Sequence, residues 1–249
     1  MWNALYSTSS HTRHWKTPTK SVRSVAISPD GSRIAAAGED KVIYMFNAHD
    51  GTPALETPVG HTNWIKSVAF SPNGSYLVSG GDDGICLWDA TSGKLLSGPL
   101  RVYGSWILSI SFSPDSRHIV SALDTSDDTT IRVWEVDDGT LTPTDLVGRH
   151  DDQVNSVAFS PDVELVVPGC GNRKIRMWDS KTMSLVFDPF GSQQHTQQIT
   201  SVTFSFDGRL VASGSDDGTI CIFDSHSGGL VLGPLRRSSM EGGGWSSCM

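Results

Sequence analysis

Residues 61–100 read HTNWIKSVAFSPNGSYLVSGGDDGICLWDATSGKLLSGPL, and four close variants of this segment occur elsewhere in the chain. The phrase SVAFSPNG at residue 67 returns as SVAISPDG at 24, SISFSPDS at 109, SVAFSPDV at 156 and SVTFSFDG at 201. Each copy continues into an apolar run that ends in an aromatic residue and a polar one, as in Trp88-Asp89. A period of about 45 residues indicates a repeat architecture in which each copy is one structural unit.

Each copy carries the signals of four short strands joined by tight turns. In the quoted copy, residues 65–71, 76–79, 85–88 and 95–100 are predicted strands, and Pro72-Asn73-Gly74 is a strong turn signal. The apolar residues show no helical period. A four-stranded sheet of this size can bury both of its faces only against other sheets. The sequence therefore predicts an all-β fold, a β-propeller of four-stranded antiparallel blades with five repeats visible.

The propeller region is expected to span residues 20–235. Its blades are predicted at residues 20–60, 61–102, 103–149, 150–194 and 195–235. Residues 1–19 form an N-terminal extension, and residues 236–249 form either a tail or the start of a sixth repeat, because Trp245 stands where a first strand would begin. Three interpretations stay open: part of a longer array, an open arc or five-blade ring, and a ring completed by self-association.

Composition narrows the class of protein. The chain has 37% hydrophobic residues, 25 glycines and a net charge of −8, which is typical of a turn-rich globular protein and disfavours nucleic acid as a partner. Its four cysteines form no Cys-x-x-Cys pair, which favours a reducing compartment, the cytoplasm with the nucleus as an alternative. Because no apolar run approaches about 18 residues, we expect neither a membrane span nor a membrane partner.

These motifs resemble those of the WD-repeat β-propeller family, the transducin β-like repeats. The family repeat runs from a Gly-His pair to a Trp-Asp pair, as does the segment from Gly60-His61 to Trp88-Asp89. The resemblance implies a buried hydrogen-bond tetrad of an indole, a hydroxyl, an imidazole and a carboxylate. In the second copy, it assigns these roles to Trp88, Ser79, His61 and Asp83, with Asp82 as the alternative carboxylate.

The other four copies keep only part of this tetrad. The positions retained are His195, Ser213 and Asp217 in the fifth copy, Ser121, Asp128 and Trp134 in the third, His150 and Trp178 in the fourth, and Asp40 in the first. The positions that depart are Phe223 in the fifth, Tyr103 in the third, Pro168 and Asn172 in the fourth, and Ala36 and Phe46 in the first. We therefore expect the second blade to be the best ordered and the first to be the loosest.

The sequence predicts no enzyme activity, no cofactor and no metal. Serine, histidine and aspartate recur together, but they do so in several copies and inside strands, which is typical of a structural unit. The acidic turns Asp82-Asp83, Asp127-Asp128 and Asp216-Asp217 lack the spacing of a calcium loop. No glycine-rich phosphate loop lies between a strand and a helix.

The family resemblance also implies a docking surface, because one rim of such propellers frequently binds partners. The candidate residues lie where the first strands begin, and they are Trp64, Lys66, Trp106, Leu108, Asn155 and Gln198. Tryptophan is enriched at interface hot spots; the alternative is that Trp64 and Trp106 pack between blades. The longer loop at 123–128 is a further candidate.

Two functional hypotheses follow. The leading one is a non-enzymatic interaction scaffold whose partners are proteins or peptides bound on the propeller rim. The alternative rests on similarity to the WD-repeat arrays of NACHT-type signalling proteins, in which case the chain is a ligand-sensing segment of a larger NTPase protein.

Overall fold

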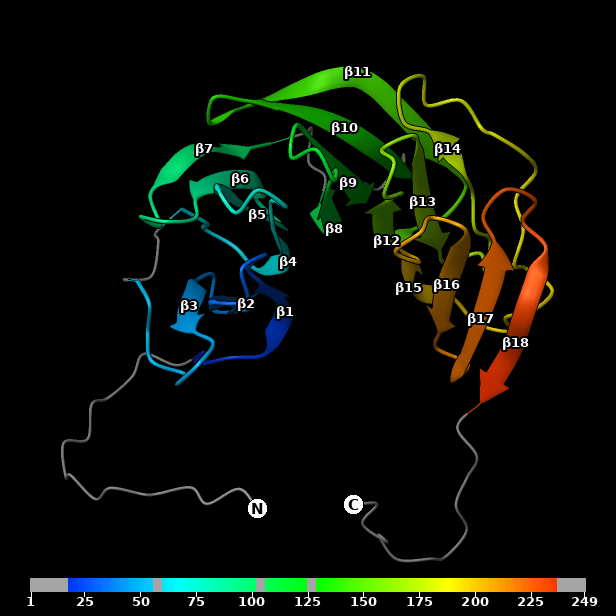
Figure 1. The fold of residues 1–249 in the computed structure, drawn as a ribbon, viewed down its shortest axis with the longest axis horizontal. Helices are drawn as coiled ribbons and strands as arrows, with labels where there is room; N and C mark the ends of the chain where they lie inside the picture. Colours follow the sequence, from blue (N-terminus) through cyan, green and yellow to red (C-terminus); the bar gives the residue numbers. More distant parts are fainter. Residues whose placement is uncertain (1–17, 56–59, 102–105, 125–128, 237–249) are drawn as a thin grey trace, which may run out of the picture.

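The computed structural model describes residues 18–55, 60–101, 106–124 and 129–236 of the chain. These residues form eighteen β-strands that are arranged in five sheets (Figure 1). Among the described residues, no helix has the length and apolar character needed to cross a bilayer.

The strands follow one another along the chain, and each sheet is one blade. Blade 1 contains β1 (Val22–Ile27), β2 (Arg33–Gly38) and β3 (Ile43–Asn47). Blade 2 contains β4 (Ile65–Phe70), β5 (Tyr76–Gly81), β6 (Gly84–Asp89) and β7 (Leu95–Leu100). Blade 3 contains β8 (Trp106–Phe112), β9 (His118–Asp124), β10 (Thr129–Asp137) and β11 (Thr140–His150). Blade 4 contains β12 (Val154–Phe159), β13 (Leu165–Cys170) and β14 (Trp178–Asp179), and blade 5 contains β15 (Ile199–Phe204), β16 (Leu210–Ser215), β17 (Thr219–Asp224) and β18 (Leu230–Arg236).

Neighbouring strands within each blade are consecutive in sequence and antiparallel. Blades 2, 3 and 5 have four strands each, whereas blades 1 and 4 have three strands each among the described residues. At the fourth position, these two blades have isolated bridges, Phe46 to Pro53 in blade 1 and Trp178 to Leu185 in blade 4. The predicted all-β propeller fold is confirmed.

The turn between the first and second strand of each blade is specified by local sequence. In blade 2, the Ser71 hydroxyl donates to Asn73 Oδ1 at 2.7 Å and accepts from the Tyr76 N–H at 2.9 Å. Gly74 has a φ of 74°, which glycine adopts without steric cost. In the other blades an aspartate takes the place of Asn73, and the serine hydroxyl donates to it. The pairs are Ser28 and Asp30, Ser113 and Asp115, Ser160 and Asp162, and Ser205 and Asp207. The repeated phrase S-P-D-G is therefore a self-contained turn.

Blades pack against one another through a small residue on the second strand of one blade. Gly80 on β5 lies under Ile107 and Ile110 of blade 3, so closely that a Cβ at residue 80 would stand 2.3 Å from Ile110 Cδ1. Gly169 on β13 lies in the same way under Ile199 and Val202 of blade 5. The apolar core therefore lies between blades and joins each sheet to the next.

A serine hydroxyl adds a directional bond at each of these junctions. It comes from the first serine of the repeated phrase and accepts a hydrogen bond from a backbone N–H on the first strand of the next blade. The four bonds are Val68 N–H to Ser24 at 3.1 Å, Ile110 N–H to Ser67 at 3.1 Å, Val157 N–H to Ser109 at 3.2 Å and Val202 N–H to Ser156 at 3.1 Å. These serines therefore fix how far consecutive blades can slide past each other.

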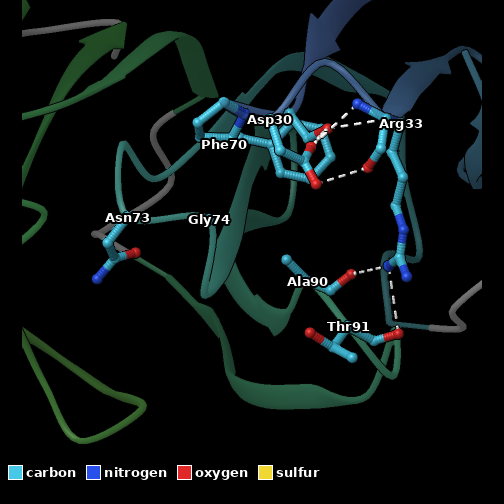
Figure 2. A pocket seen from close by; sticks show the side chains of 10 residues that line it. Asp30, Arg33, Phe70, Asn73, Gly74, Ala90 and Thr91 are labelled. Carbon is cyan, nitrogen blue, oxygen red and sulfur yellow. Dashed lines mark hydrogen bonds between the residues drawn. The ribbon is translucent and has the colours of Figure 1, made fainter.

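Blades 1 and 2 are also joined at the rim where the first strands end. Arg33 of blade 1 donates from Nη1 to the carbonyl oxygens of Ala90 at 2.5 Å and Thr91 at 3.3 Å in blade 2 (Figure 2). The guanidinium closes one side of a hollow that Phe70 and Gly74 also line. Asp30, in the same hollow, is held by hydrogen bonds from Ser28 and Ser32, which lower the pKa of its carboxyl to about 2. The two charged side chains of the hollow, Asp30 and Arg33, are therefore already hydrogen-bonded to other parts of the fold.

The five blades form an arc with blade 1 at one end and blade 5 at the other (Figure 1). None of the main strand-to-strand contacts among the described residues joins these two terminal blades.

The packing of blades predicts opposite effects for two glycines at equivalent positions. Gly80→Ala forces Ile107 and Ile110 to move and is expected to lower the free energy of unfolding by about 1–3 kcal/mol. Gly214→Ala on blade 5 places its Cβ in open space and is expected to raise that free energy by about 0.5–1 kcal/mol, since alanine loses less backbone entropy. Urea denaturation of both variants measures the difference, and equal effects at the two positions would contradict this packing.

Candidate partner-binding rim and its polar locks

Blade 2 holds an unbroken chain of four buried polar side chains. The Trp88 indole N–H donates to Ser79 Oγ at 2.8 Å, and Ser79 Oγ lies 2.7 Å from His61 Nε2. His61 Nδ1 in turn lies 2.5 Å from Asp83 Oδ1. Each buried polar atom in this tetrad has a partner, which avoids a cost of about 1–3 kcal/mol for each orphaned group.

The structure distinguishes between the two candidate carboxylates of blade 2. Asp83 accepts from His61 and also from the Thr62 N–H at 2.5 Å, whereas Asp82 forms an ion pair with Lys66 at 3.0 Å. Burial acts to raise the pKa of Asp83, but the hydrogen bonds from His61 and Thr62 outweigh it and hold that pKa below its usual value. Asp83 is therefore the carboxylate of the tetrad.

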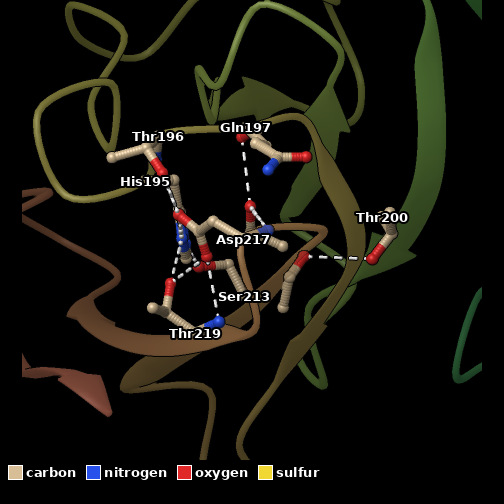
Figure 3. Close-up of polar contacts among 9 residues, drawn as sticks. His195, Thr196, Gln197, Thr200, Ser213, Asp217 and Thr219 are labelled. Atoms are coloured by element: carbon tan, nitrogen blue, oxygen red, sulfur yellow. Dashed lines mark hydrogen bonds and ion pairs between the residues drawn. The ribbon is translucent and has the colours of Figure 1, made fainter. Parts of the chain in front are cut away.

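Blade 5 inserts a threonine into the same chain (Figure 3). His195 Nε2 lies 2.7 Å from Ser213 Oγ, while its Nδ1 contacts Thr219 Oγ1 at 2.9 Å. The Thr219 hydroxyl donates to Asp217 Oδ1 at 2.5 Å, and Asp217 Oδ2 is 3.7 Å from His195. Burial lowers the pKa of His195, and it is only partly opposed by Asp217. Thr219 was not predicted from the sequence, although a hydroxyl two residues beyond the acidic pair is the signal that could have suggested it.

Blades 1 and 3 have shorter versions of this hydrogen-bond chain. In blade 3, the Trp134 indole donates to Ser121 Oγ at 2.8 Å. In blade 1, Asp40 Oδ2 accepts from the Tyr44 hydroxyl at 2.9 Å, so Tyr44 supplies a donor that the sequence analysis did not identify. Burial, followed by the bond to Asp40, raises the pKa of Tyr44 to about 12.

In blade 4 an arginine replaces part of the hydrogen-bond chain. Pro168 provides no hydroxyl, and both Trp178 Nε1 and His150 Nε2 are buried without a hydrogen-bond partner among the described residues. Arg176 instead brings Nη1 to 3.2 Å from His150 Nδ1 and donates from Nη2 to Asp151 Oδ2 at 2.5 Å. Asn172 accepts from the Lys174 N–H within its own turn. The guanidinium of Arg176 is therefore the partner of His150 in blade 4, where blade 2 has the carboxylate of Asp83.

The tetrads are locks of the fold. Ser79 is fully buried, and its oxygen is shared between an indole and an imidazole, so it has no open side toward a substrate. Within the described ranges, no group of three or more histidine, cysteine or acidic side chains is placed to hold a metal ion.

In blades 1, 2, 4 and 5, a repeated backbone bond brings two loops to one rim, which we call the start rim. It joins the residue before the first strand to the turn between the second and third strands. The examples are Asp82 N–H to Trp64 O at 3.0 Å, Gly171 N–H to Gln153 O at 2.7 Å and Asp216 N–H to Gln198 O at 3.1 Å. The candidate docking residues therefore share this rim with the acidic turns Asp82-Asp83 and Asp216-Asp217.

The two tryptophans of the start rim are both packed and exposed. Trp64 is 41% exposed, and the Arg23 guanidinium of blade 1 lies 5.9 Å from its ring centroid. Trp106 is 50% exposed, and Lys66 Nζ of blade 2 lies 4.8 Å from its ring centroid. Each indole is thus held by a cation from the preceding blade, a contact worth about 0.5–1 kcal/mol at an exposed site.

The remaining candidate residues of the start rim are polar except for Leu108. Asn155 of blade 4 donates to the Ile199 carbonyl at 2.8 Å and to Gln198 Oε1 at 3.5 Å. Gln198 is exposed and donates to Asp216 at 2.6 Å. Leu108 of blade 3, at the position that Asn155 occupies in blade 4, is half-buried. Arg23 of blade 1 occupies the position that Lys66 has in blade 2. It therefore belongs to the start rim, and it was not among the candidates named from the sequence.

Several predicted positions lie outside the described residues. They are Tyr103, Asp127, Asp128, most of the 123–128 loop, residues 1–17 and the C-terminal segment with Trp245. Of the loop, Asp124 accepts from Gln153 Nε2 at 2.6 Å, which ties it to blade 4.

Antiparallel blades, indole–hydroxyl–imidazole locks and one variable rim define a β-propeller of the WD-repeat class. A family model described as "WD domain, G-beta repeat" matches residues 7–47, 54–89, 96–135, 142–179 and 184–224, and the chain belongs to the WD40 repeat family. The chain is similar to a guanine nucleotide-binding protein subunit beta from Zea mays, with 28% identity over 196 residues. The match covers 73% of this chain and 50% of the relative, so the chain spans about half of that protein's length.

The locks predict opposite effects for two substitutions at the hydroxyl position. Ser79→Ala leaves Trp88 Nε1 and His61 Nε2 without their shared oxygen and is expected to lower the free energy of unfolding by about 1–3 kcal/mol. Pro168→Ser supplies an oxygen to His150 Nε2 and Trp178 Nε1, the two nitrogens of blade 4 without a partner, and is expected to raise the free energy of unfolding by about 1 kcal/mol. Denaturant titration measures both, and a loss of stability in Pro168→Ser would contradict the assignment.

The buried imidazole of blade 4 predicts acid sensitivity. Burial, and then Arg176, lower the pKa of His150 to about 3, with Asp151 acting in the opposite direction. Because the folded-state pKa lies below the unfolded value of about 6.5, the stabilisation is complete above that pH and is lost as the pH falls toward 3. Between pH 6.5 and 5 the loss is expected to be about 2 kcal/mol, at about 1.4 kcal/mol per pH unit.

The measurement is the free energy of unfolding at pH 7 and pH 5. His150→Gln is expected to have a smaller pH dependence than the wild type, whereas His226→Gln, at an exposed histidine, keeps the wild-type dependence. Equal pH dependence in the wild type and His150→Gln would show that His150 is not the sensitive group.

Proposed function

We propose that this chain is a non-enzymatic scaffold that binds partner proteins or peptides on the start rim. WD40 propellers are typical of protein-interaction scaffolds, and the relative from Zea mays is named as a subunit of a guanine nucleotide-binding protein. The fold alone does not define a partner, because one fold hosts many functions. The proposal therefore depends on the residues of the rim itself.

The observation that carries the proposal is the pair of half-exposed indoles. Trp64 and Trp106 stand at equivalent positions of adjacent blades and are backed by Arg23 and Lys66. A large aromatic surface that is already fixed loses little conformational entropy when a partner covers it. Tryptophans in such settings are frequent hot spots of binding.

The polar half of the rim supports this function by providing hydrogen-bonding groups on blades 4 and 5, beyond the blades that carry the indoles. Gln198 is exposed on blade 5, and Asn155 of blade 4 lies beside it. Lys66 adds a positive charge that Asp82 partly neutralises. An aromatic centre with a polar surround is the usual composition of a protein-binding surface.

The absence of an enzymatic role is part of the proposal. In blades 2 and 5, the serine and histidine that could suggest hydrolysis are buried and bonded within the locks. We also propose an intracellular location, the cytoplasm or nucleus, because Cys86, Cys170 and Cys221 are buried free thiols. Burial raises the pKa of Cys86 and Cys170 to about 12, which keeps both unreactive.

A second proposal is that the chain is a ligand-sensing segment of a larger NACHT-type signalling protein. It rests on the phrasing of the repeats, S-V-A-F-S-P-D-G and G-P-L, which is similar to that of such arrays. An NTPase reading frame joined to this sequence would support the sensor, and a free-standing reading frame would support the scaffold.

The rim is tested by removing both indoles together. Trp64→Ala/Trp106→Ala is expected to reduce the recovery of proximity-labelled or co-purified partners by more than about tenfold, since each hot-spot tryptophan contributes about 2 kcal/mol or more. The fold should persist, because both side chains are half-exposed. Val186→Ala, at a side chain that is 47% exposed on blade 4, is the matched control and should leave recovery unchanged. Unchanged recovery in the double variant would remove the start rim as the binding surface.

A further inference from the structure

On the rim where the first strands end, blades 3 and 4 enclose a hollow that is larger than the one between blades 1 and 2. Its volume is about 490 Å³, compared with about 270 Å³ between blades 1 and 2. All the residues that line it belong to the described parts of blades 3 and 4. Ligand pockets have volumes of about 300–1,000 Å³. The blade 3–4 hollow is therefore large enough to hold a bound side chain.

The difference between the two hollows follows from the residue that begins the second strand. In blade 1 this residue is Arg33, which crosses the junction and donates to two backbone carbonyls of blade 2 (Figure 2). In blades 2 and 4 it is Tyr76 and Leu165, which pack against the cores of the junctions that follow. In blade 3 it is His118, whose side chain is 38% exposed and lies 3.8 Å from Asp115 of the same turn. The imidazole therefore stays with its own blade and leaves the hollow open.

The walls of the blade 3–4 hollow are apolar. They are formed by Val133 and Leu146 of blade 3 and by Phe159 and Val163 of blade 4. Val133 and Phe159 belong to the buried core of this junction, whereas Leu146 and Val163 are half-buried. An apolar side chain bound here would therefore extend the core that joins the two blades.

Val163 has a backbone conformation that valine disfavours. Its φ is 66°, in the left-handed region, where a β-branched side chain is strained. The same turn position is Gly31, Gly74 and Gly208 in blades 1, 2 and 5, and Ser116 in blade 3. Strain of this kind is concentrated at functional sites. The valine thus gives the hollow an apolar wall that the turn itself does not require.

Two exposed aspartates, Asp115 of blade 3 and Asp162 of blade 4, line the same hollow. Oδ1 of each carboxylate accepts hydrogen bonds from a serine hydroxyl and a backbone N–H of its own turn. Asp162 Oδ2 has no hydrogen bond among the described residues, and Asp115 Oδ2 lies 3.8 Å from the His118 imidazole. In the smaller hollow, both oxygens of Asp30 are hydrogen-bonded within the turn. Each carboxylate of the larger hollow therefore has an oxygen that a cation can approach.

The charges of the lining favour a cation. Asp115 and Asp162 stand against the single ammonium of Lys181, so the lining has an excess of negative charge when His118 is neutral. The hydrogen bond from the Ser160 hydroxyl lowers the pKa of Asp162, which keeps this carboxyl ionised at neutral pH. Apolar walls with carboxylates beside them fit an apolar side chain that has a lysine or arginine next to it.

We propose that the blade 3–4 hollow binds a short segment of a partner protein that inserts one apolar side chain and carries a lysine or arginine beside it. The apolar side chain packs on Phe159 and Val163, and the basic side chain pairs with Asp115 or Asp162. This site lies on the rim opposite the start rim and does not depend on the proposed partner binding there.

The test is the selection of peptides from a displayed library of short random sequences on the full chain. The library is first depleted on the Asp115→Asn/Asp162→Asn variant, which removes peptides that bind elsewhere. Asparagine is compatible with the turn, because Asn73 makes the same Oδ1 bonds in blade 2. The affinities of the enriched peptides are then measured by fluorescence anisotropy. Asp207→Asn is the matched control, since Asp207 is an exposed aspartate with the same turn bonds on blade 5, outside the hollow.

The enriched peptides are expected to share an apolar residue beside a lysine or arginine. Asp115→Asn/Asp162→Asn is expected to weaken their binding by about fivefold or more and to reduce its salt dependence, whereas Asp207→Asn changes neither. Val163→Gly is expected to weaken binding by about threefold or more while Tm stays the same or rises, because glycine adopts a positive φ without strain.

Two further outcomes separate this site from the start rim and decide the proposal. The Trp64→Ala/Trp106→Ala variant should bind the selected peptides with wild-type affinity, and a loss of binding there would assign the peptides to the start rim and overturn the proposal. The proposal is also overturned if no peptide is enriched, if the enriched peptides lack a basic residue, or if Val163→Gly binds them as tightly as the wild type.

Discussion

The fit between a small residue on the second strand of one blade and the aliphatic side chains of the next blade's first strand supports the whole arc. A small sheet cannot bury both faces alone, so the apolar core lies between sheets rather than within one. Gly80 under Ile107 and Ile110 shows how little space the contact leaves. The serine that accepts an N–H across the same junction fixes the alignment of the two blades. At blade 5, where no described sheet follows, the same positions stay open.

The polar locks contribute within a blade and are more tolerant of change than the junctions. Blade 2 has the complete chain of indole, hydroxyl, imidazole and carboxylate. Blade 5 inserts Thr219, blade 1 uses Tyr44, and blade 4 recruits Arg176. The common requirement is that buried polar atoms find partners, and different side chains can satisfy it when they come from neighbouring strands. The orphaned nitrogens of His150 and Trp178 show a lock in which this requirement is not fully met.

The proposed binding surface is separate from both the junctions and the polar locks. The residues spent on turns, junctions and locks recur from copy to copy, whereas the residues of the start rim differ between blades. Arg23 over Trp64 and Lys66 over Trp106 give one part of that rim a fixed aromatic surface, while Asn155 and Gln198 make the other part polar. A rigid fold therefore presents a varied row of side chains, which is the property that a docking surface needs.

The sequence by itself determined the strands, the turns and three residues of the blade 2 tetrad, Trp88, Ser79 and His61, because each depends on a few repeated positions. The S-P-D-G turn closes through its own serine and aspartate. Only the tertiary structure decided that Asp83 rather than Asp82 completes the tetrad, and that cations from a preceding blade hold Trp64 and Trp106. It also decided that Val25 and Ile220 are exposed although their counterparts are buried. These outcomes depend on which side chains of other strands and blades come within reach, and that is set by the packing of sheets rather than by any local pattern.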